Sequence, residues 1–563
     1  MTRRLVMGNS QTEEEATMSS VNTPSTEAIL RNAEATIHDL SRRRLLVGAG
    51  AAGALAGIAG LLPGRSADIA QASGPNDAMV NVKDYGAVGD GKTDDREPIM
   101  KAIEAGVAEG RTVFLPPGVY MLGSRLYMLH GLTMKGAGRF STTLRLMPNC
   151  NGPILDAPPA PKLVGNDLTL MDITFDGDAQ NSELTGASVA LLHGYDTNRW
   201  YVARCRFMHG RGYGVGLQGR PTTNTGHEDL YFVDCEFVEN HVYASGSGGI
   251  DTKSGKRFTM VNCVVIKEPV GFDIRSHFTT LINCHAYDCD FGFLIRAISN
   301  VPGSTDWEGT FTVLGGSVTN CIGTGLTIAN STEQANDAGI TNATVIGFNS
   351  RNNGRGLATA EPDSWNPDNA IALTVLGGHF EGNGDQGIAA NGARYALVQG
   401  AVCRGNGSHG IELIETKDAS ISGCDLRDNN GWGLYMDNGA KSTDRISTVG
   451  NVIKGNGAGA ITSLGSGSKV LANTTDQVST LSSASTIAVP EGCDTVLITG
   501  STNIGSVKAS FDGRRIVLRF AQALTVVSGN NLKLRGNFNA TSLDTLTLVC
   551  MGGNWYEVAR SAN

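Results

Sequence analysis

The sequence predicts an all-β protein: a β-helix, in which the chain winds as a solenoid, followed by a small antiparallel β domain. Three observations lead to this prediction. One short phrase recurs at intervals of 21 to 32 residues over more than 250 residues. The chain contains 73 Gly, and it has no long amphipathic helical run after residue 110. Repeats of this length, built from short β-rich units with Gly and Asn at the corners, are typical of stacked β-coils rather than of helical pairs.

Each repeat is marked by a small or apolar residue that usually follows a run of Val, Ile or Leu. These markers are Ile173, Cys205, Cys235, Cys263, Cys284, Gly316, Phe348, Gly378, Ala401, Cys424 and Asn451. About eight or nine residues after most markers comes a Gly followed by an apolar residue, as in Gly325-Leu326, Gly356-Leu357, Gly387-Ile388, Gly410-Ile411 and Gly433-Leu434. Most of these glycines are interpreted as tight corners, because Gly adopts backbone conformations that other residues avoid.

Cysteine stands at the marker position in several repeats. The chain has 11 Cys, an odd number, and no pair with CxxC spacing. We expect Cys205, Cys235, Cys263 and Cys284 to form an internal ladder of small buried thiols, because equivalent side chains of adjacent coils stack about 4.8 Å apart. A metal cluster and a disulfide framework are the alternatives, and the spacing favours neither of them.

The first 72 residues read as a leader. Residues 1 to 40 are polar and without periodicity, and Ser41-Arg42-Arg43-Arg44 then precedes an uncharged Ala/Gly/Leu run that ends at Leu62. With Ala70-Gln71-Ala72 this segment resembles a twin-arginine export signal, which implies cleavage near residue 72 and a mature protein in the periplasm, on the cell surface or secreted. A membrane anchor is the alternative, but the Gly and Ala content makes the run weakly hydrophobic, so we expect no stable membrane insertion after cleavage.

Residues 81 to 120 contain a phrase with a known counterpart. It reads Asn81-Val82-Lys83-Asp84-Tyr85-Gly86-Ala87-Val88-Gly89-Asp90-Gly91-Lys92-Thr93-Asp94-Asp95, then a helix with Ile99, Ile103 and Val107, then Val113-Phe114-Leu115-Pro116-Pro117-Gly118-Val119-Tyr120. This resembles the N-terminal region of the pectate-lyase-like superfamily, which implies a right-handed parallel β-helix with an N-terminal cap, here over residues 73–475. The superfamily includes lyases, hydrolases, epimerases, fructotransferases and phage tailspikes, so the resemblance does not specify the reaction. The acidic residues Asp90, Asp94 and Asp95 are interpreted as a capped turn before the helix, in preference to a metal site.

The repeat stops after residue 470. Residues 476–563 alternate apolar and polar residues between Gly and Asn turns, which predicts a small antiparallel β domain. This domain resembles the C-terminal β-sandwich modules of β-helix enzymes and tailspikes. The resemblance implies a carbohydrate-binding or trimerising role, so a homotrimer is one expected assembly. The alternative role is a cap over the last open coil.

The densest chemistry lies between Gly249 and Arg296, where three copies of one pattern follow each other. Side chains alternate between the faces of a strand, so the aromatic and aliphatic residues of each copy face the core and the ionisable ones face outward. A first outward column is predicted at Gly216, Asp251, Asp273, Leu294 and Thr327, and a second at Gln218, Lys253, Arg275, Arg296 and Ala329. The predicted catalytic residues are Asp251, Lys253, Asp273, Arg275, His277 and Arg296. The alternative is an alternating salt-bridge ladder on a solvated face.

The longer repeats carry extra residues that fall just after the outward strand, at 219–229, 299–309 and 358–369. We expect these loops to wall a groove over the charged face. A cleft with aromatic walls suits a polysaccharide, because sugar rings pack their apolar faces on aromatic rings. The predicted substrate-binding residues are Gln218, His227, Trp307, Glu308, Trp365, Glu412, Tyr435 and Asp437.

Charge ranks the function classes. The formal net charge of -9 excludes nucleic acid as an expected partner, whereas the predicted site is rich in cations. This contrast favours a lyase that cleaves a uronate-containing polysaccharide by β-elimination, with Lys253, Arg275 and Arg296 neutralising the substrate carboxylate and His277 or Lys253 as the base. A glycoside hydrolase or fructotransferase-like enzyme using Asp251 and Asp273 is the second class, and a tailspike-like binding protein is the third. The sequence specifies no metal site, and a requirement for Ca²⁺ stays open.

Overall fold

The structure is a computed structural model that describes residues 79–150, 152–158, 165–184, 190–218, 226–240, 248–297, 309–330, 340–359, 371–437, 443–462, 467–471, 473–475, 479–490 and 493–563. Ala78–Asn563 forms a compact unit. The predicted leader, residues 1–72, lies outside the described residues. Among the helices of the described ranges, none is both long and apolar enough to cross a membrane.

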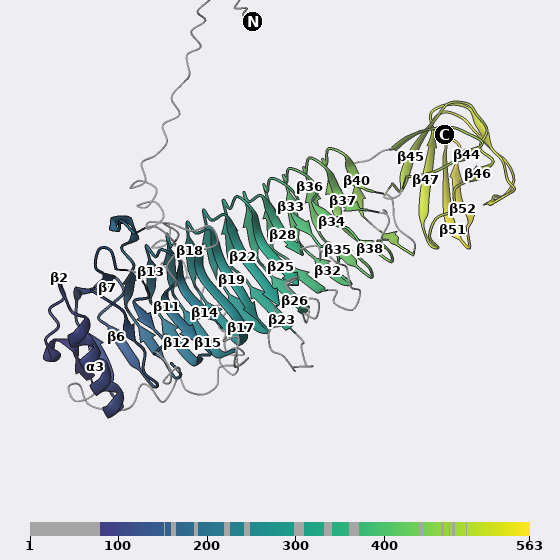
Figure 1. Cartoon of the computed structure of the whole chain (residues 1–563). Coiled ribbons are helices and arrows are strands. Elements are labelled where there is room, and N and C mark those ends of the chain that lie inside the picture. The colour runs from purple at the N-terminus through teal and green to yellow at the C-terminus, as the bar shows by residue number, and fades with distance from the viewer. Residues whose placement is uncertain are drawn as a thin grey trace, which may run out of the picture. The chain divides into compact units, whose positions relative to one another are not determined.

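Parallel strands stack coil upon coil, and in the described residues they form three faces (Figure 1). Face one carries the predicted site. Its strands, in order along the helix, are β5 (Leu126–Tyr127), β8 (Leu155–Asp156), β11 (Ala190–Tyr195), β14 (Tyr213–Gln218), β17 (Gly248–Val261), β19 (Val270–Ser276), β22 (Phe291–Ala297), β25 (Thr324–Asn330), β28 (Arg355–Thr359), β31 (Ile388–Ala389), β34 (Ile411–Leu413), β37 (Trp432–Met436) and β40 (Gly459–Ile461).

Face two follows face one in each coil, and the long strand β17 bends from one to the other. Its C-terminal half pairs with β15 and β20. The other strands of face two are β1 (Met79–Asn81), β3 (Thr112–Leu115), β6 (Thr133–Gly136), β9 (Thr169–Met171), β12 (Asn198–Ala203), β15 (His227–Val233), β20 (Phe278–Ile282), β23 (Gly309–Leu314), β26 (Ile340–Ile346), β29 (Ala372–Leu376), β32 (Tyr395–Gln399), β35 (Ser420–Ser422), β38 (Ser447–Val449) and β41 (Lys469–Leu471).

Face three is a separate parallel sheet of mostly short strands. They are β2 (Asp90–Asp94), β4 (Gly118–Leu122), β7 (Thr142–Leu146), β10 (Thr174–Asp176), β13 (Arg206–Met208), β16 (Glu236–Val238), β18 (Val264–Ile266), β21 (His285–Tyr287), β24 (Ser317–Thr319), β27 (Asn349–Arg351), β30 (His379–Glu381), β33 (Val402–Arg404), β36 (Asp425–Arg427), β39 (Val452–Lys454) and β42 (Thr474–Thr475). The predicted parallel β-helix is confirmed, and the apolar side chains of all three faces meet in one core.

The markers of the repeat occupy the corner between face two and face three. Each follows a residue in the left-handed conformation, for example Asp234 (φ 52°) before Cys235 and Gly377 (φ 63°) before Gly378. Asp, Asn and Gly tolerate that conformation best, which explains why the corners are so rich in them. The predicted thiol ladder is confirmed, because Cys205, Cys235, Cys263 and Cys284 are buried free cysteines.

A cap covers the N-terminal end of the core. It consists of the short helix η2 (Val82–Tyr85) and of α3 (Arg96–Glu109), which buries Ile99 and Ile103. Asp95 stands at the N-cap of α3, but its carboxylate accepts hydrogen bonds from the amides of Val88 (2.6 Å) and Gly89 (2.9 Å). The acidic residues therefore brace the loop before α3, as the capped-turn interpretation requires. A second 3-10 helix, η3 (Ala179–Asn181), follows β10.

The C-terminal module has an apolar core of its own. Its strands are β43 (Ser479–Ser482), β44 (Thr486–Ile487), β45 (Thr495–Thr499), β46 (Ser506–Val507), β47 (Arg515–Phe520), β48 (Leu524–Val526), β49 (Leu532–Lys533), β50 (Phe538–Ala540), β51 (Thr545–Met551) and β52 (Asn554–Ser561). The expected antiparallel pairing holds for β47–β51–β52 and for β48–β50, whereas β43–β45–β47 run parallel. The long connections between β43, β45 and β47 make parallel crossovers feasible where short hairpins would not.

Candidate functional site

The outward column predicted from the repeats exists on face one. Gly216 pairs with Asp251, Asp251 with Asp273, Asp273 with Leu294, and Leu294 with Thr327. The same column continues in both directions along the helix. Its further members are Tyr127, Asp156 and His193 at one end and Ala358, Ala389, Glu412 and Tyr435 at the other.

The second predicted column forms only in part. Arg275 pairs with Arg296 and Arg296 with Ala329. Between Thr252 and Gly255, however, the register of β17 against β19 shifts. A bulge at this point breaks the simple alternation of side chains, so the pairing of Lys253 with Arg275 stays a prediction. The side chains of Lys253 and Gln218 lie outside the described residues.

Asp273 is the centre of the charged cluster. Its carboxylate accepts hydrogen bonds from Arg275 Nε (3.2 Å) and Nη2 (2.8 Å) on the same strand, and from Arg296 Nη2 (2.6 Å) on the next coil. Arg275 Nε also lies 3.9 Å from Asp251 Oδ1. The side chains of Asp251 and Asp273 are only 4% and 3% exposed, which distinguishes this cluster from a solvated surface ladder.

Tyr213, which the repeat pattern missed, belongs to the same environment. Burial raises the pKa of its phenol, and the charges of Asp251 and Asp273 raise it further. Tyr213 is therefore protonated at neutral pH and can donate a proton. It was missed because it stands at the start of β14, before the Gly from which outward positions were counted.

His277 lies at the corner where β19 leads into β20, and it is buried. Its amide donates to the Gly255 carbonyl (2.9 Å). Burial, with a smaller contribution from the charge of Lys256, lowers the pKa of His277 to about 4. The imidazole is consequently neutral at pH 7 and retains a lone pair that can accept a proton.

A second group that the sequence did not reveal lies two coils before Asp251 on the same column. His193 Nδ1 is 2.8 Å from Asp156 Oδ1, and Arg125 Nη1 is 2.6 Å from Asp156 Oδ2. His193 and Asp156 are both buried. His193 could have been found by extending the column of outward positions to earlier coils. It was not found because residues 190–193 lack the Gly that marked the other outward strands.

Glu412 and Tyr435 also lie on the column, and Asp437 directly follows β37. Glu412 accepts hydrogen bonds from Gln386 Nε2 (2.7 Å) and Asn391 Nδ2 (2.9 Å). The ring of Tyr435 stacks on His409, with a centroid distance of 4.3 Å and an interplanar angle of 3°. The sequence analysis offered these residues as substrate-binding, and the register puts Glu412 five coils beyond Asp273 on the same column.

The prediction that His227 lines the groove is wrong. His227 begins β15 and is fully buried, and its Nδ1 lies 2.9 Å from Thr197 Oγ1. The chain turns inward before this residue, so burial lowers its pKa to about 4 and removes it from any substrate. The other predicted wall residues, Trp307, Glu308 and Trp365, lie outside the described residues. Within the described ranges, no group of three His, Cys, Asp or Glu side chains could hold a metal ion.

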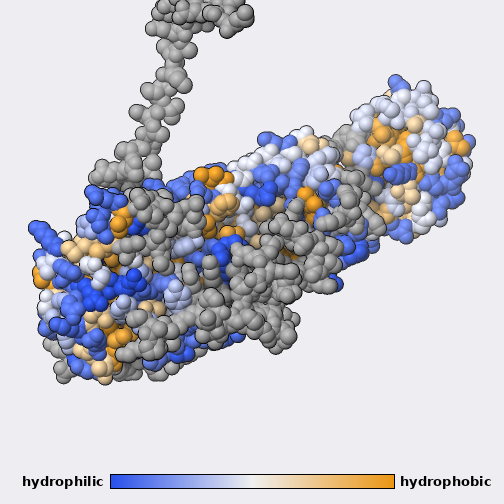
Figure 2. Space-filling model, viewed as in Figure 1, coloured by the Kyte–Doolittle hydropathy of each residue, from blue (hydrophilic) through white to orange (hydrophobic). Residues whose placement is uncertain are grey.

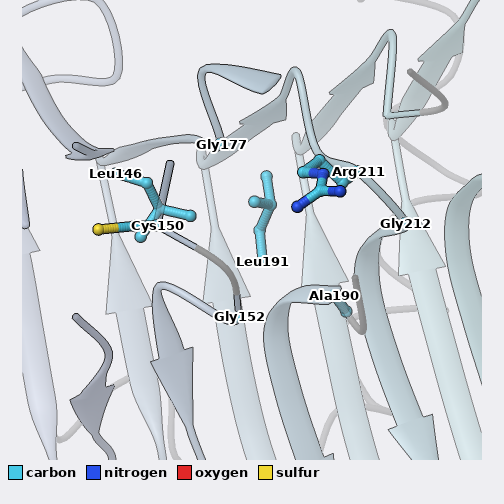
Figure 3. A pocket seen from close by; sticks show the side chains of 8 residues that line it. All are labelled: Leu146, Cys150, Gly152, Gly177, Ala190, Leu191, Arg211 and Gly212. Atoms are coloured by element: carbon cyan, nitrogen blue, oxygen red, sulfur yellow. The ribbon is translucent and has the colours of Figure 1, made fainter. Parts of the chain in front are cut away.

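One hollow lies beside this column, at the corner between face three and face one (Figure 3). It is a small hollow, partly open to solvent, and it is lined by Leu146, Cys150, Gly152, Gly177, Ala190, Leu191, Arg211 and Gly212. Its lining combines the apolar side chains of Leu146 and Leu191 with the guanidinium of Arg211. Figure 2 shows one side of the β-helix, on which hydrophilic residues predominate and apolar residues form scattered patches.

Comparison with known proteins finds two family models along the chain. Residues 79–294 match the model "Rhamnogalacturonase A/epimerase, pectate lyase-like", and residues 308–475 match "Right handed beta helix region". The pre-neck appendage protein of Bacillus phage B103 is 27% identical over 254 residues, which is 40% of this chain and 28% of that protein. Alginate lyase 7 of Azotobacter vinelandii is 34% identical over 121 residues, 18% of this chain and 13% of that enzyme. The chain thus spans less than two thirds of the length of either relative.

A solved structure shares the architecture. The catalytic unit of the GH87 α-1,3-glucanase from Streptomyces thermodiastaticus superposes with a TM-score of 0.51 at 16% identity, covering 72% of this chain and 71% of that one. Similarity at this identity shows a common fold and does not show a common reaction. Both family models, the three parallel faces and this superposition agree. The chain therefore carries a pectate-lyase-like region over residues 79–294 and a right-handed β-helix region over residues 308–475, in one parallel β-helix fold.

Proposed function

We propose that this protein is a polysaccharide lyase that cleaves a uronate-containing acidic polysaccharide by β-elimination on face one. The observation that carries the proposal is the buried Asp273 carboxylate held by both Arg275 and Arg296. Carbohydrate-acting relatives, among them alginate lyase 7, support a polysaccharide as substrate. The twin-arginine-type leader supports an exported enzyme, because such polymers occur outside the cytoplasm.

The arginines supply what β-elimination needs first. The C5 proton of a uronate is acidic only when the neighbouring carboxylate is neutralised, and a guanidinium binds a carboxylate through two parallel N–H groups. Asp273 holds the two guanidinium groups in place before substrate arrives. Preorganised charges of this kind stabilise the enolate-like transition state at little reorganisation cost.

The proton steps then balance. A base, for which His277 and Lys253 are the candidates, takes the C5 proton, and the C–H electrons form the C4–C5 double bond. The C4–O bond breaks, and the leaving oxygen takes a proton from an acid. Tyr213 suits that role, because burial keeps its phenol protonated. His277 suits the role of base, because its lowered pKa leaves the imidazole neutral.

The same contacts argue against a retaining hydrolase built on Asp273. A carboxylate nucleophile must be free to attack the anomeric carbon, whereas both oxygens of Asp273 are engaged by guanidinium donors. Hydrolysis is nevertheless an outcome that the experiment distinguishes.

The test is an assay of the purified protein on a panel of uronate polymers. β-Elimination yields an unsaturated product that absorbs in the ultraviolet, and both lyase and hydrolase yield reducing ends. New reducing ends without ultraviolet absorbance would identify a hydrolase and overturn the proposal. Binding without either product would identify a carbohydrate-binding protein.

Variants at the cluster test its role. Arg296→Gln should lower kcat/KM by roughly 10²–10³, the loss expected for one preorganised electrostatic contact. Asp273→Asn should retain measurable activity if Asp273 only orients the arginines, and should abolish it if Asp273 is a nucleophile. Arg275→Lys should recover part of what Arg275→Ala loses, because an ammonium lacks the forked geometry.

Face three offers a matched control. There Asp425 accepts from Arg427 of the same strand and pairs with Arg404 of the adjacent coil, the arrangement seen at Asp273. The two control arginines are 40% exposed, against 10% for Arg275 and 25% for Arg296. Arg427→Gln should leave kcat/KM within twofold of the wild type. An equal loss in Arg427→Gln and Arg296→Gln would mean that both variants act through stability.

A further inference from the structure

A second polar cluster lies on face one, on the same column as Asp273 but five coils further along. We call it the Glu412 site, and it consists of Gln386, Asn391, His409, Glu412 and Tyr435. Stacked coils are about 4.8 Å apart, so five coils separate Asp273 and Glu412 by about 24 Å. One extended polysaccharide chain lying along face one would reach both places.

The Glu412 carboxylate is buried without a compensating cation among the described residues. It accepts hydrogen bonds from the neutral amides of Gln386 (2.7 Å) and Asn391 (2.9 Å). Its one ionic contact within the described ranges is His409 Nε2, at 3.9 Å. Glu412 itself is 6% exposed.

His409 does not supply a positive charge. The amide of Trp432 donates to His409 Nδ1 (2.9 Å), so Nδ1 carries a lone pair and the imidazole is the neutral Nε2–H tautomer. Burial lowers the pKa of His409 and outweighs the opposing effects of Glu412 and Asp385. The net charge of the Glu412 site at neutral pH is therefore negative.

The Glu412 site also has a buried acceptor with no donor. Gln386 is 7% exposed, and its Oε1 has no hydrogen-bond partner in the described part of the chain. Leaving such an atom unsatisfied costs stability, so it indicates a missing donor. A column of Asn side chains joins neighbouring coils at the corner between face three and face one. In the described residues its members are satisfied: Asn406, for example, accepts from Asn383 and donates to Asn429. If the contact between Gln386 and Glu412 served only to join two coils, we would expect its polar atoms to be paired in the same way.

The surroundings specify the ligand. Carboxylate and amide oxygens accept hydrogen bonds, so they suit a ligand with hydroxyl donors. The stacked rings of Tyr435 and His409 present a flat face of the kind on which sugar rings pack. A negative site repels a uronate, whereas the Asp273 cluster with its two arginines attracts one. The two places on one column therefore differ in the charge of the sugar that they accept.

We propose that the Glu412 site binds a neutral, hydroxyl-bearing sugar residue of the polysaccharide whose uronate occupies the Asp273 cluster. The substrate is accordingly a heteropolymer of uronic and neutral sugars rather than a uronate homopolymer. This inference rests on the proposed function for the position of the uronate, and on the Glu412 site alone for the neutral sugar.

The test compares gellan, which has one glucuronate among neutral sugars in its repeat, with polyglucuronate. Binding is measured by retardation in affinity electrophoresis, and cleavage by ultraviolet absorbance. The wild type should prefer gellan. Glu412→Gln should weaken the binding of gellan about tenfold and improve that of polyglucuronate, because it removes both a hydroxyl acceptor and the repulsion. Tyr435→Ala, at a half-buried position where misfolding is a smaller risk, should weaken the binding of gellan to a similar extent.

Glu381→Gln provides the control, because Glu381 lies on face three with His379 (3.4 Å) and Arg351 (2.8 Å) beside it. It should change neither affinity. Equal affinity of the wild type for both polymers, or an unchanged preference in both Glu412→Gln and Tyr435→Ala, would overturn the inference. Binding that follows the predicted preference without any unsaturated product would support the Glu412 site and would count against the lyase proposal instead.

Discussion

Glu268 is buried at a corner between two faces of the helix, and this position raises the pKa of its carboxyl group. At the equivalent corner of several other coils stands an Asn, and these Asn side chains bond to one another from coil to coil. Glu268 takes that place beside Asn240, whose amide and side chain donate to its carboxylate (2.9 and 2.8 Å). Burial raises the pKa of Glu268 to about 8, against the smaller opposing effect of these hydrogen bonds.

This pKa makes the stability of the helix depend on pH. The folded state holds a proton on Glu268 that the unfolded state releases near pH 4.5, so folding is favoured below that pH. As pH rises from 4.5 to 8, the free energy of unfolding should fall by at most about 1.4 kcal/mol per pH unit from this one group. Denaturant titrations across this range measure the slope.

Glu268→Gln should flatten that slope, because an amide does not titrate. Glu239→Gln is a suitable control. Glu239 directly precedes Asn240 in the neighbouring coil, it is partly exposed, and Lys267 Nζ lies 3.0 Å from its carboxylate. A slope that survives in Glu268→Gln would assign the pH dependence to other groups.

At the residue scale, the sequence predicted well where a side chain faces and poorly what it contacts. The pairing of Asp251 with Asp273 follows from the period of the repeat alone, and it was predicted. Tyr213 was missed because it stands at the start of its strand, before the Gly from which positions were counted. His193 was missed because its strand lacks that Gly. His227 was misplaced because the end of a long connection cannot be located by counting residues.

At the scale of elements, the corners rather than the strands carry the most specific hydrogen bonds. Asn406 is fully buried, accepts from the backbone amide (3.1 Å) and side chain (3.0 Å) of Asn383, and donates to the Phe380 carbonyl (3.0 Å). Each Asn in the column thus closes its own turn and supports the next coil. Several members of this column belong to Asn-Gly dipeptides in the sequence. From the sequence alone, these dipeptides indicated only turns.

Removing one member should cost more than one hydrogen bond. Asn406→Ala leaves the buried amide of Asn383 without an acceptor, so we expect a loss of about 2–3 kcal/mol in the free energy of unfolding. Asn349→Ala, on the outer side of β27, should cost less than about 0.5 kcal/mol. Urea unfolding of the two variants measures the difference, and equal costs would show that the column contributes no more than surface polarity does.

The elements themselves were predictable because a period of 21 to 32 residues with alternating side chains leaves little choice of architecture. Strand direction in the C-terminal module was harder. Its segments alternate apolar and polar residues in the same way whether they pair parallel or antiparallel, so the pattern could not distinguish β43–β45 from β47–β51.

At the scale of the whole molecule, one column runs through both polar clusters of face one. Asp156, His193, Asp251, Asp273, Glu412 and Tyr435 share it because a parallel β-helix repeats the same outward position in every coil. A polymeric substrate suits such a site, since it too repeats along one direction. If the proposed function holds, one polysaccharide chain would contact the two clusters through different sugars.

The apolar interior, in contrast, is divided. One core runs through the coils from Val80 to Val470, and a second, from Ile487 to Trp555, belongs to the C-terminal module. Phe511 of the module packs against the core of the coils. The buried residues of the second core pack on one another within the module. A solenoid is stabilised by contacts between neighbouring coils, so we expect the second core to unfold separately in spite of the Phe511 contact. We therefore expect two transitions when the protein is heated in a calorimeter.

Substitutions in the two cores assign the transitions. Leu518→Ala, in the module, should destabilise by about 2–5 kcal/mol and lower one melting temperature only. Ile421→Ala, in β35 of the helix, should lower the other. Because the Asp273 cluster lies on the helix, Leu518→Ala should leave turnover unchanged at temperatures below both transitions. If either substitution moves both transitions together, the two cores unfold as one cooperative unit, and the module is then part of what keeps the coils of face one in register.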